Sequence, residues 1–335
     1  MSRRVIPGLE APDPLLEREV RARLDEVESA LEKAVRADSD LLAETSSYLL
    51  SAGGKRFRPM LVLLAGYFGD PTDPRLISGS VAIELVHLAT LYHDDVIDEA
   101  DSRRGIPSVN ARWDNTVAIL TGDYLFARAS EISTELGTEV IGLLARTIAT
   151  LCDGQIREVE VAGRLDQREP AYMETIRRKT GALIATSCRL GGMLSDAPVE
   201  HLDVLEGFGE ALGMAFQLSD DIMDVAASQR ELGKEPGVDM REGVYTLPVL
   251  HALTAGARRD ELASLLGQGP PEGERLQAAL EIVRAAESLD HARRAVATEV
   301  DRATGLAAQL PAGPSRSALI TLAEYLAARC GARSA

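Results

Sequence analysis

The chain has 335 residues, of which 45% are hydrophobic and 26% are charged. This composition is typical of a globular protein, and it excludes disordered and fibrous classes. Asp and Glu number 52 against 36 Lys and Arg, which gives a net charge of −16. So acidic a protein is not expected to bind nucleic acid, because the phosphate backbone attracts basic surfaces.

Three further features bear on the compartment. The longest apolar run, residues 60–68, is about half the length of a membrane span. The arginines near the start are not followed by an apolar stretch, so we predict no secretory signal. The cysteines (Cys152, Cys188 and Cys330) lack paired spacing, which fits a reducing compartment. We therefore expect a cytoplasmic protein.

The predicted secondary structure is helical throughout. Aromatic residues make up only 4% of the chain, while Ala, Leu, Glu and Arg are abundant, which favours helices over sheets. Asp13 and Pro14 predict the start of a first helix, and apolar residues at 16, 20, 24, 27, 31 and 35 follow on one face. Further helices are predicted over 40–51, 59–69, 76–99, 115–135, 138–162, 171–194, 199–226, 247–254, 258–267, 274–288, 290–309 and 315–331.

No segment shows the alternation of a strand or an Asn-Gly hairpin turn, and 233–243 is predicted to be a loop. We find no repeat and no linker long enough to separate domains. The sequence therefore predicts an all-α fold, a single domain over 1–335 in which 1–12 and 331–335 are frayed.

Two aspartate clusters share one spacing. Asp94, Asp95 and Asp98 end one predicted apolar helix, and Asp220, Asp221 and Asp224 end another. Carboxylates four residues apart lie on one face of a helix, where they repel each other, and the C-terminal end of a helix disfavours anions further. A compensating cation is expected, and Mg²⁺ prefers such hard oxygen ligands. A solvated acidic surface is the alternative explanation.

Basic residues gather at separate places along the chain. They are the turn Gly53-Gly54-Lys55-Arg56-Phe57-Arg58-Pro59, the pair Arg103-Arg104, the segment Arg177-Arg178-Lys179-Thr180, and Lys234. Arginine forks, a lysine point charge and flexible glycines suit phosphate groups. No nucleotide-binding glycine loop, HExxH or GxSxG motif is present in the sequence. These observations favour a site for two phosphorylated groups, with one of them held through Mg²⁺.

In this order the motifs resemble those of the trans-isoprenyl diphosphate synthases, the polyprenyl synthetase family, and in particular its medium- and long-chain bacterial members. The motifs are GGKRxRP at 53–59, DDxxD at 94–98, RRG at 103–105, GQ at 154–155, KT at 179–180, FQ at 216–217, DDxxD at 220–224 and TLPVL at 246–250. The resemblance implies a helical bundle around a deep central cavity, and it implies a homodimer.

The resemblance also implies roles for individual residues. The six aspartates would serve up to three Mg²⁺ ions that hold the diphosphate of an allylic substrate (geranyl, farnesyl or geranylgeranyl diphosphate). Arg103, Lys179 and Lys234 would contact that diphosphate, and Thr180 and Gln217 would line the reacting region. Lys55, Arg58, His87 and Arg104 would bind isopentenyl diphosphate.

The implied reaction is a head-to-tail condensation. The allylic diphosphate ionises, the double bond of isopentenyl diphosphate attacks the cation, and a proton is lost, with no protein base required. One position departs from the family. Val244 stands where many members have a lysine, and Arg241 is the candidate to replace that charge.

Product length is expected to depend on residues before the first aspartate cluster, where the family limits chain growth with bulky side chains. Here Ala89 and Thr90 are small, and Val86 lies one turn further along the helix. We therefore predict a product of C20 or longer, in the range C30 to C50. Close helix packing is the alternative explanation for the small side chains, and a short-chain (C10 to C20) synthase is the alternative function.

Other classes fit the motifs less well. A class I terpene cyclase or a head-to-head prenyl synthase would not need both the basic turn and a second DDxxD. A non-catalytic partner subunit of a heteromeric synthase would be expected to lose aspartates, whereas this chain keeps all six. A long polyprenyl product would be insoluble in water, so we expect transient membrane contact at its release.

Overall fold

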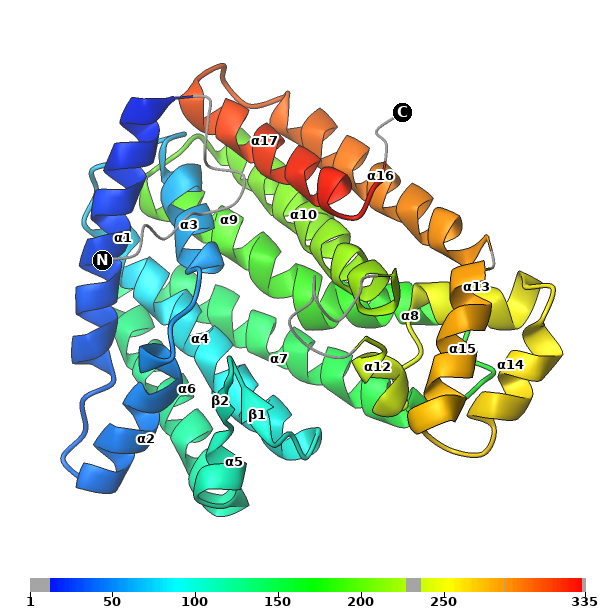
Figure 1. Ribbon diagram of the computed structural model, residues 1–335. Coiled ribbons are helices and arrows are strands. Elements are labelled where there is room, and N and C mark those ends of the chain that lie inside the picture. The colour runs from blue at the N-terminus through cyan, green and yellow to red at the C-terminus, as the bar shows by residue number, and fades with distance from the viewer. Residues whose placement is uncertain (1–12, 227–235, 286, 333–335) are drawn as a thin grey trace. The chain divides into compact units, whose positions relative to one another are not determined.

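The computed structural model describes residues 13–226, 236–285 and 287–332, and it is 77% helical (Figure 1). This confirms the predicted all-α class. The helices of the first half are α1 (Pro14–Ala34), α2 (Asp40–Ser51), α3 (Phe57–Gly66), α4 (Arg75–Ile97), α5 (Val109–Arg112), α6 (Asn115–Leu136) and α7 (Thr138–Val161). Between α4 and α5 lie two short strands, β1 (Ser102–Arg103) and β2 (Ile106–Pro107).

The second half continues the helical pattern. After α8 (Glu169–Ile176) comes one π-helical turn, η1 (Arg177–Gly181). The remaining helices are α9 (Ala182–Leu194), α10 (Val199–Ala226), α12 (Val238–Arg241), α13 (Leu247–Ala255), α14 (Arg259–Leu266), α15 (Gly273–Ala285), α16 (Ser288–Ala307) and α17 (Pro314–Arg329).

Local sequence signals explain how α1 begins and which face it buries. The Asp13 side chain accepts hydrogen bonds from the backbone N–H groups of Leu15 (2.8 Å) and Leu16 (3.3 Å), as a helix cap does. Val20, Val27 and Leu31 are fully buried on the predicted apolar face. The prediction of this helix from its cap and its periodicity is confirmed.

Five short elements were not predicted, namely β1, β2, α5, α12 and η1. β1 and β2 pair antiparallel, with Arg103 opposite Ile106. Arg104 and Gly105 form the turn between them, and both have a positive φ (54° and 79°), as two-residue hairpin turns require. The turn was missed because its first residue is arginine instead of asparagine. A helical turn, α12, lies within the predicted loop, and η1 interrupts the predicted helix over 171–194.

The chain divides into two compact units, which are described separately. The first comprises 1–148, 183–206 and 308–319, and the second comprises 149–182, 207–307 and 320–335. The helices α7, α10 and α17 contribute residues to both units. The prediction of a single domain concerns how these units are joined, and it stays a prediction.

The core of the first unit is built around α4. This helix packs against α1, α3, α5 and α6, and Ile83, Leu85 and Leu88 have no exposed surface. By length and composition α4 resembles a membrane span, yet 67% of its most apolar window is buried inside the protein, as in the core helix of a globular protein. Packing on several sides explains why this helix is apolar around most of its circumference.

In the second unit α13 occupies the corresponding central position. It packs against α8, α14, α15 and α16, and Leu247, Val249 and Leu250 are buried. Pro248 lies in its first turn, where the missing backbone N–H has no partner to lose. This arrangement accounts for the TLPVL sequence as the buried start of a core helix.

Candidate active site

The basic turn of the first unit connects α2 to α3. Gly53 has a φ of +92°, and Arg56 adopts a left-handed conformation (φ 49°) directly before α3 begins. Lys55 is exposed and Arg58 is half-buried, while the side chain of Arg56 is buried. The turn therefore directs the side chain of Arg56 into the protein, whereas Lys55 and Arg58 retain contact with solvent.

The charges of Arg58 and Arg104 both act on the side chain of His87. Burial, together with the charges of Arg58 and Arg104, holds the pKa of His87 well below its usual range, so the imidazole is neutral at pH 7. The guanidinium of Arg104 donates to the carbonyl oxygens of Leu49 (2.8 Å) and Gly53. The structure thus brings Arg58 and Arg104 close enough to His87 to interact with it electrostatically, and their shared role in binding stays a prediction.

The first aspartate cluster marks the end of α4. Asp98 caps the helix, and Glu99 has a left-handed conformation (φ 49°) that allows the Ala100 N–H to bond the Asp95 carbonyl at 2.9 Å. Asp94 is half-buried, Asp98 is exposed, and Asp95 is fully buried. The helix thus presents Asp94 and Asp98 on one face, while Asp95 points into the protein.

Asp95 is held by one arginine of the hairpin. Arg103 Nε donates to Asp95 Oδ1 at 2.6 Å, and among the described residues the buried Oδ2 has no hydrogen-bond partner. Burial raises the pKa of Asp95, and the charge of Arg103 opposes this rise. The hairpin therefore connects the RRG sequence to the first aspartate cluster through the ion pair of Arg103 with Asp95.

The residues predicted to set product length differ in their surroundings. Val86 and Ala89 are fully buried, whereas Thr90 is half-buried, and its hydroxyl donates to the His87 carbonyl at 2.8 Å. At about 100° per residue, Thr90 lies about 40° from Asp94 around the helix, and Ala89 lies about 140° away. Of these small residues, Thr90 shares the face of Asp94 most closely.

In the second unit the GQ and KT sequences meet at the π-helical turn. A Cβ at Gly154 would lie 2.6 Å from the backbone nitrogen of Lys179 and 2.9 Å from Arg178 Cβ, so this position must be glycine for α7 to approach η1. The Lys179 ammonium pairs with Glu158, one turn after Gly154. Single π-helical turns within helices occur frequently at functional sites.

A chain of hydrogen bonds joins the KT, FQ and second DDxxD sequences. Thr180 Oγ1 donates to Gln217 Oε1 at 2.8 Å, and Gln217 Nε2 donates to Asp221 Oδ1, also at 2.8 Å. The Tyr172 hydroxyl donates to the other carboxylate oxygen, Asp221 Oδ2. Burial nevertheless raises the pKa of Asp221 to about 7. The predicted residues Thr180, Gln217 and Asp221 therefore form one connected group.

The other two aspartates of this cluster have separate partners. Asp220 is half-buried and forms an ion pair with Arg329 at the end of α17 (2.6 Å). The buried Asp224 carboxylate accepts from the backbone N–H groups of Val238 and Asp239, both at 3.3 Å, and thereby caps α12. Lys234, also predicted as a site residue, lies outside the described residues.

The carboxylates suit a metal shared with a ligand better than a metal held by protein alone. Within 13–226, 236–285 and 287–332, no three His, Cys, Asp or Glu side chains converge closely enough to hold a metal ion. Asp94 and Asp98 nevertheless offer hard oxygen ligands one turn apart. Mg²⁺ commonly takes one or two carboxylates and completes its coordination with water and substrate phosphates. The donor set therefore fits Mg²⁺ together with a diphosphate.

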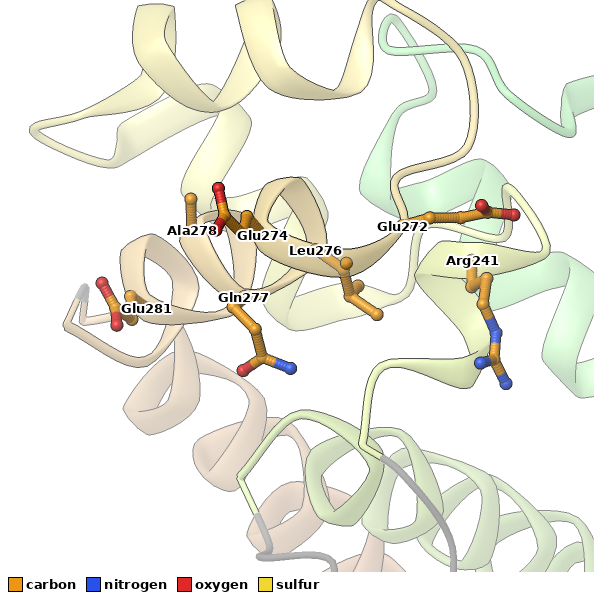
Figure 2. A pocket seen from close by; sticks show the side chains of 8 residues that line it. Arg241, Glu272, Glu274, Leu276, Gln277, Ala278 and Glu281 are labelled. Atoms are coloured by element: carbon orange, nitrogen blue, oxygen red, sulfur yellow. The ribbon is translucent and has the colours of Figure 1, made fainter.

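The second unit contains a pocket of 710 Å³. Figure 2 shows it between α12 and α15, lined by Arg241, Glu272, Gly273, Glu274, Leu276, Gln277, Ala278 and Glu281. Among these residues sequence analysis singled out only Arg241. Its side chain is exposed, and Val244 follows three residues later. Whether Arg241 replaces the missing lysine stays a prediction.

Several side chains of these groups were not found from the sequence. Glu84, Glu158, Tyr172 and Arg329 each contact or neighbour a predicted residue. The sequence offered a weak indication of Glu158 and Tyr172, because each lies within a turn or two of a recognised motif, GQ or KT. Arg329 gave none, since its partner Asp220 lies more than 100 residues away in the chain.

The fold and these groups define a class: an all-α protein with two aspartate clusters on long helices and separate sets of basic side chains. Residues 39–283 match the model of the polyprenyl synthetase family. The chain is 39% identical to nonaprenyl diphosphate synthase of Mycobacterium tuberculosis over 98% of both chains. It is 40% identical to component 2 of heptaprenyl diphosphate synthase from Geobacillus stearothermophilus, over 90% of this chain and 94% of that protein.

Solved structures agree with these relatives. Geranylgeranyl pyrophosphate synthase from Corynebacterium glutamicum, complexed with calcium and isoprenyl diphosphate, has a TM-score of 0.85 and 40% identity, covering 96% of this chain and 99% of that chain. The chain therefore belongs to the polyprenyl synthetase family, as the motifs predicted, and its named relatives are prenyltransferases.

Proposed function

We propose that this chain is a trans-polyprenyl diphosphate synthase that condenses geranyl, farnesyl or geranylgeranyl diphosphate with isopentenyl diphosphate. The observation that carries the proposal is the match to prenyl diphosphate synthases along nearly the whole chain. All six aspartates are retained within this match, which argues against a non-catalytic subunit. The proposed product is C20 or longer, in the range C30 to C50.

The proposed roles divide the basic residues between two diphosphates. In the first unit, Lys55, Arg58, Arg104 and the neutral His87 would bind the diphosphate of isopentenyl diphosphate. Lys179, Lys234 and Arg103 would contact the allylic diphosphate, and the carboxylates of both clusters would bind it through up to three Mg²⁺ ions. Bound Mg²⁺ would supply positive charge that stabilises the leaving diphosphate.

The protein side chains would promote ionisation, and the departed diphosphate would take part in proton loss. Arginine and lysine donors would stabilise negative charge as the allylic C–O bond breaks, which lowers the barrier to the allylic cation. Thr180 and Gln217, hydrogen-bonded to each other, would line the region where the new carbon–carbon bond forms. His87 stays neutral and no catalytic dyad is required, so the departed diphosphate would accept the proton lost in the final step.

The partly exposed Asp94 and Asp98 are the best candidates for metal ligands in their cluster, and Asp220 is the best candidate in the other. Asp95, Asp221 and Asp224 would instead orient the metal ligands, because their side chains are buried. We further propose a cytoplasmic homodimer in which the two units form one domain, with membrane contact only when product is released.

The proposal is tested with radiolabelled isopentenyl diphosphate, each of the three allylic diphosphates and Mg²⁺, with products separated by chromatography. We expect incorporation into products beyond C30, abolition by EDTA and recovery when Mg²⁺ is added back. Products ending between C10 and C20 would contradict the length and keep the reaction. Absence of incorporation with every allylic substrate would contradict the catalytic function.

A further inference from the structure

Glu84 is a carboxylate buried among arginines. It lies on α4 with 2% of its surface exposed, and its Oε1 is 3.3 Å from Nη1 of Arg56. Arg56 is itself buried, and its other nitrogens donate to Glu28 (2.7 and 2.9 Å) and to the Leu50 carbonyl (3.2 Å). Arg56 is thus occupied by protein acceptors and is not poised to bind a ligand.

Two more arginines surround the same carboxylate. A Cβ at Gly54 would lie 2.5 Å from Arg56 Nη1 and 3.2 Å from Arg104 Nη1, so these guanidinium groups approach each other beside this glycine. Glu84 interacts electrostatically with Arg104 and Arg58 as well as with Arg56. Arg58 Nε is buried and has no hydrogen-bond partner within the part of the chain that the structure describes.

The balance of charge in this group is positive. Burial lowers the pKa of Arg58 to about 10, and the charge of Glu84 opposes that effect. Like charges held close together in a partly desolvated site destabilise the folded protein unless an anion compensates them. In the free protein Glu84 supplies part of that compensation. A diphosphate bound by Arg58 and Arg104 would supply the rest.

We propose that Glu84 is the internal counter-ion of the isopentenyl diphosphate site, stabilising its arginines when no diphosphate is bound. This inference rests on the proposed function, which assigns Arg58 and Arg104 to that diphosphate. Glu84 is then a positioning residue with two opposed effects. It stabilises the free protein, and it weakens diphosphate binding because its negative charge repels the incoming anion.

The test compares the full chain with its Glu84→Gln variant, using inorganic pyrophosphate as the probe without metal or allylic substrate. The variant should unfold at a lower temperature when free. It should bind pyrophosphate more tightly in calorimetry, by on the order of tenfold, since a unit charge is removed near a multivalent anion. Pyrophosphate should also raise its unfolding temperature more than it raises that of the unmodified chain.

Glu28→Gln is the matched control. Glu28 forms the other ion pair of Arg56 but is 22% exposed, so its loss should lower stability with a much smaller change in pyrophosphate affinity. Equal or weaker pyrophosphate binding by Glu84→Gln would overturn the counter-ion role. Failure of the unmodified chain to bind pyrophosphate would instead overturn the diphosphate site itself, and with it this inference.

Arg58→Gln keeps the proposal testable if Glu84→Gln does not fold. Removing a half-buried cation whose buried Nε lacks a partner among the described residues should raise the unfolding temperature of the free protein, and it should weaken pyrophosphate binding by tenfold or more. A lower unfolding temperature for this variant, or unchanged binding, would show that the arginines are not in excess over their counter-ion. Either result would overturn the proposal.

Discussion

The two aspartate clusters have the same spacing and different surroundings. In the first, Asp95 pairs with Arg103, and its other oxygen has no partner in the described ranges. In the second, Asp221 accepts hydrogen bonds on both oxygens, from Gln217 and Tyr172. The shared spacing aligns the first and last aspartates on a helix face, whereas the neighbouring elements decide what each carboxylate does.

The third aspartates differ in the same way. Asp98 is exposed at the end of α4, where a left-handed Glu99 stops the helix. Asp224 is buried and caps α12, because α10 continues to Ala226 and the backbone N–H groups of Val238 and Asp239 lie beside it. Two copies of one motif can therefore differ in how many of their carboxylates are exposed to a ligand.

The largest expected effect is on turnover. Asp94→Ala should reduce kcat by on the order of a thousandfold, because it removes a proposed ligand of the charge that stabilises the leaving diphosphate. Asp220→Ala should act similarly in the other cluster. Steady-state assays with isopentenyl diphosphate check both variants. Asp166→Ala, which removes an exposed partner of Arg164, is the control, and unchanged turnover in Asp94→Ala would contradict the metal role.

The second prediction compares the stability changes caused by substituting two glycines of α7. Gly154→Ala should destabilise the protein by about 3 kcal/mol and lower kcat, because its methyl group would press on the backbone of Lys179. Gly142→Ala should instead stabilise α7 by up to about 1 kcal/mol, since only the flexible Arg146 side chain lies near it. Urea denaturation measures both changes. Equal effects would mean that α7 and η1 do not constrain each other.

The comparison of Asp95 with Asp221 can be tested directly. Arg103→Gln should destabilise the protein by about 2 to 3 kcal/mol, because it leaves the buried Asp95 without its ionic partner. Tyr172→Phe should cost about 1 kcal/mol, since Gln217 still donates to Asp221. Chemical denaturation without ligands compares the two variants. A larger loss for Tyr172→Phe would reverse the ranking of the two sites.

The smallest effect concerns product length. Thr90→Phe should shorten the product by one or more isoprene units with little loss of stability, because Thr90 is half-buried on the face of Asp94. Ala89→Phe should mainly destabilise the protein, by about 1 to 3 kcal/mol, since Ala89 is fully buried. Chromatography of products and thermal unfolding separate these outcomes. An unchanged product from Thr90→Phe would exclude this helix face as the limit to chain growth.

The sequence by itself determined the helices and the family. Periodicity and caps are local properties, so the cap at Asp13 and the predicted range of α10 agree with the structure. The aspartate and basic motifs could likewise be recognised in the sequence, because a diphosphate site requires particular residue types at short spacing.

Only the tertiary structure decided the partners of those residues. Arg56 looked like another phosphate-binding cation of the basic turn, yet Glu28 and Glu84 occupy it from two other helices. By sequence position Asp221 is equivalent to Asp95, but in the structure it accepts hydrogen bonds from Tyr172 and Gln217. Burial and long-range contacts fix which charges are neutralised by protein and which remain for a ligand, and neither follows from spacing along the chain.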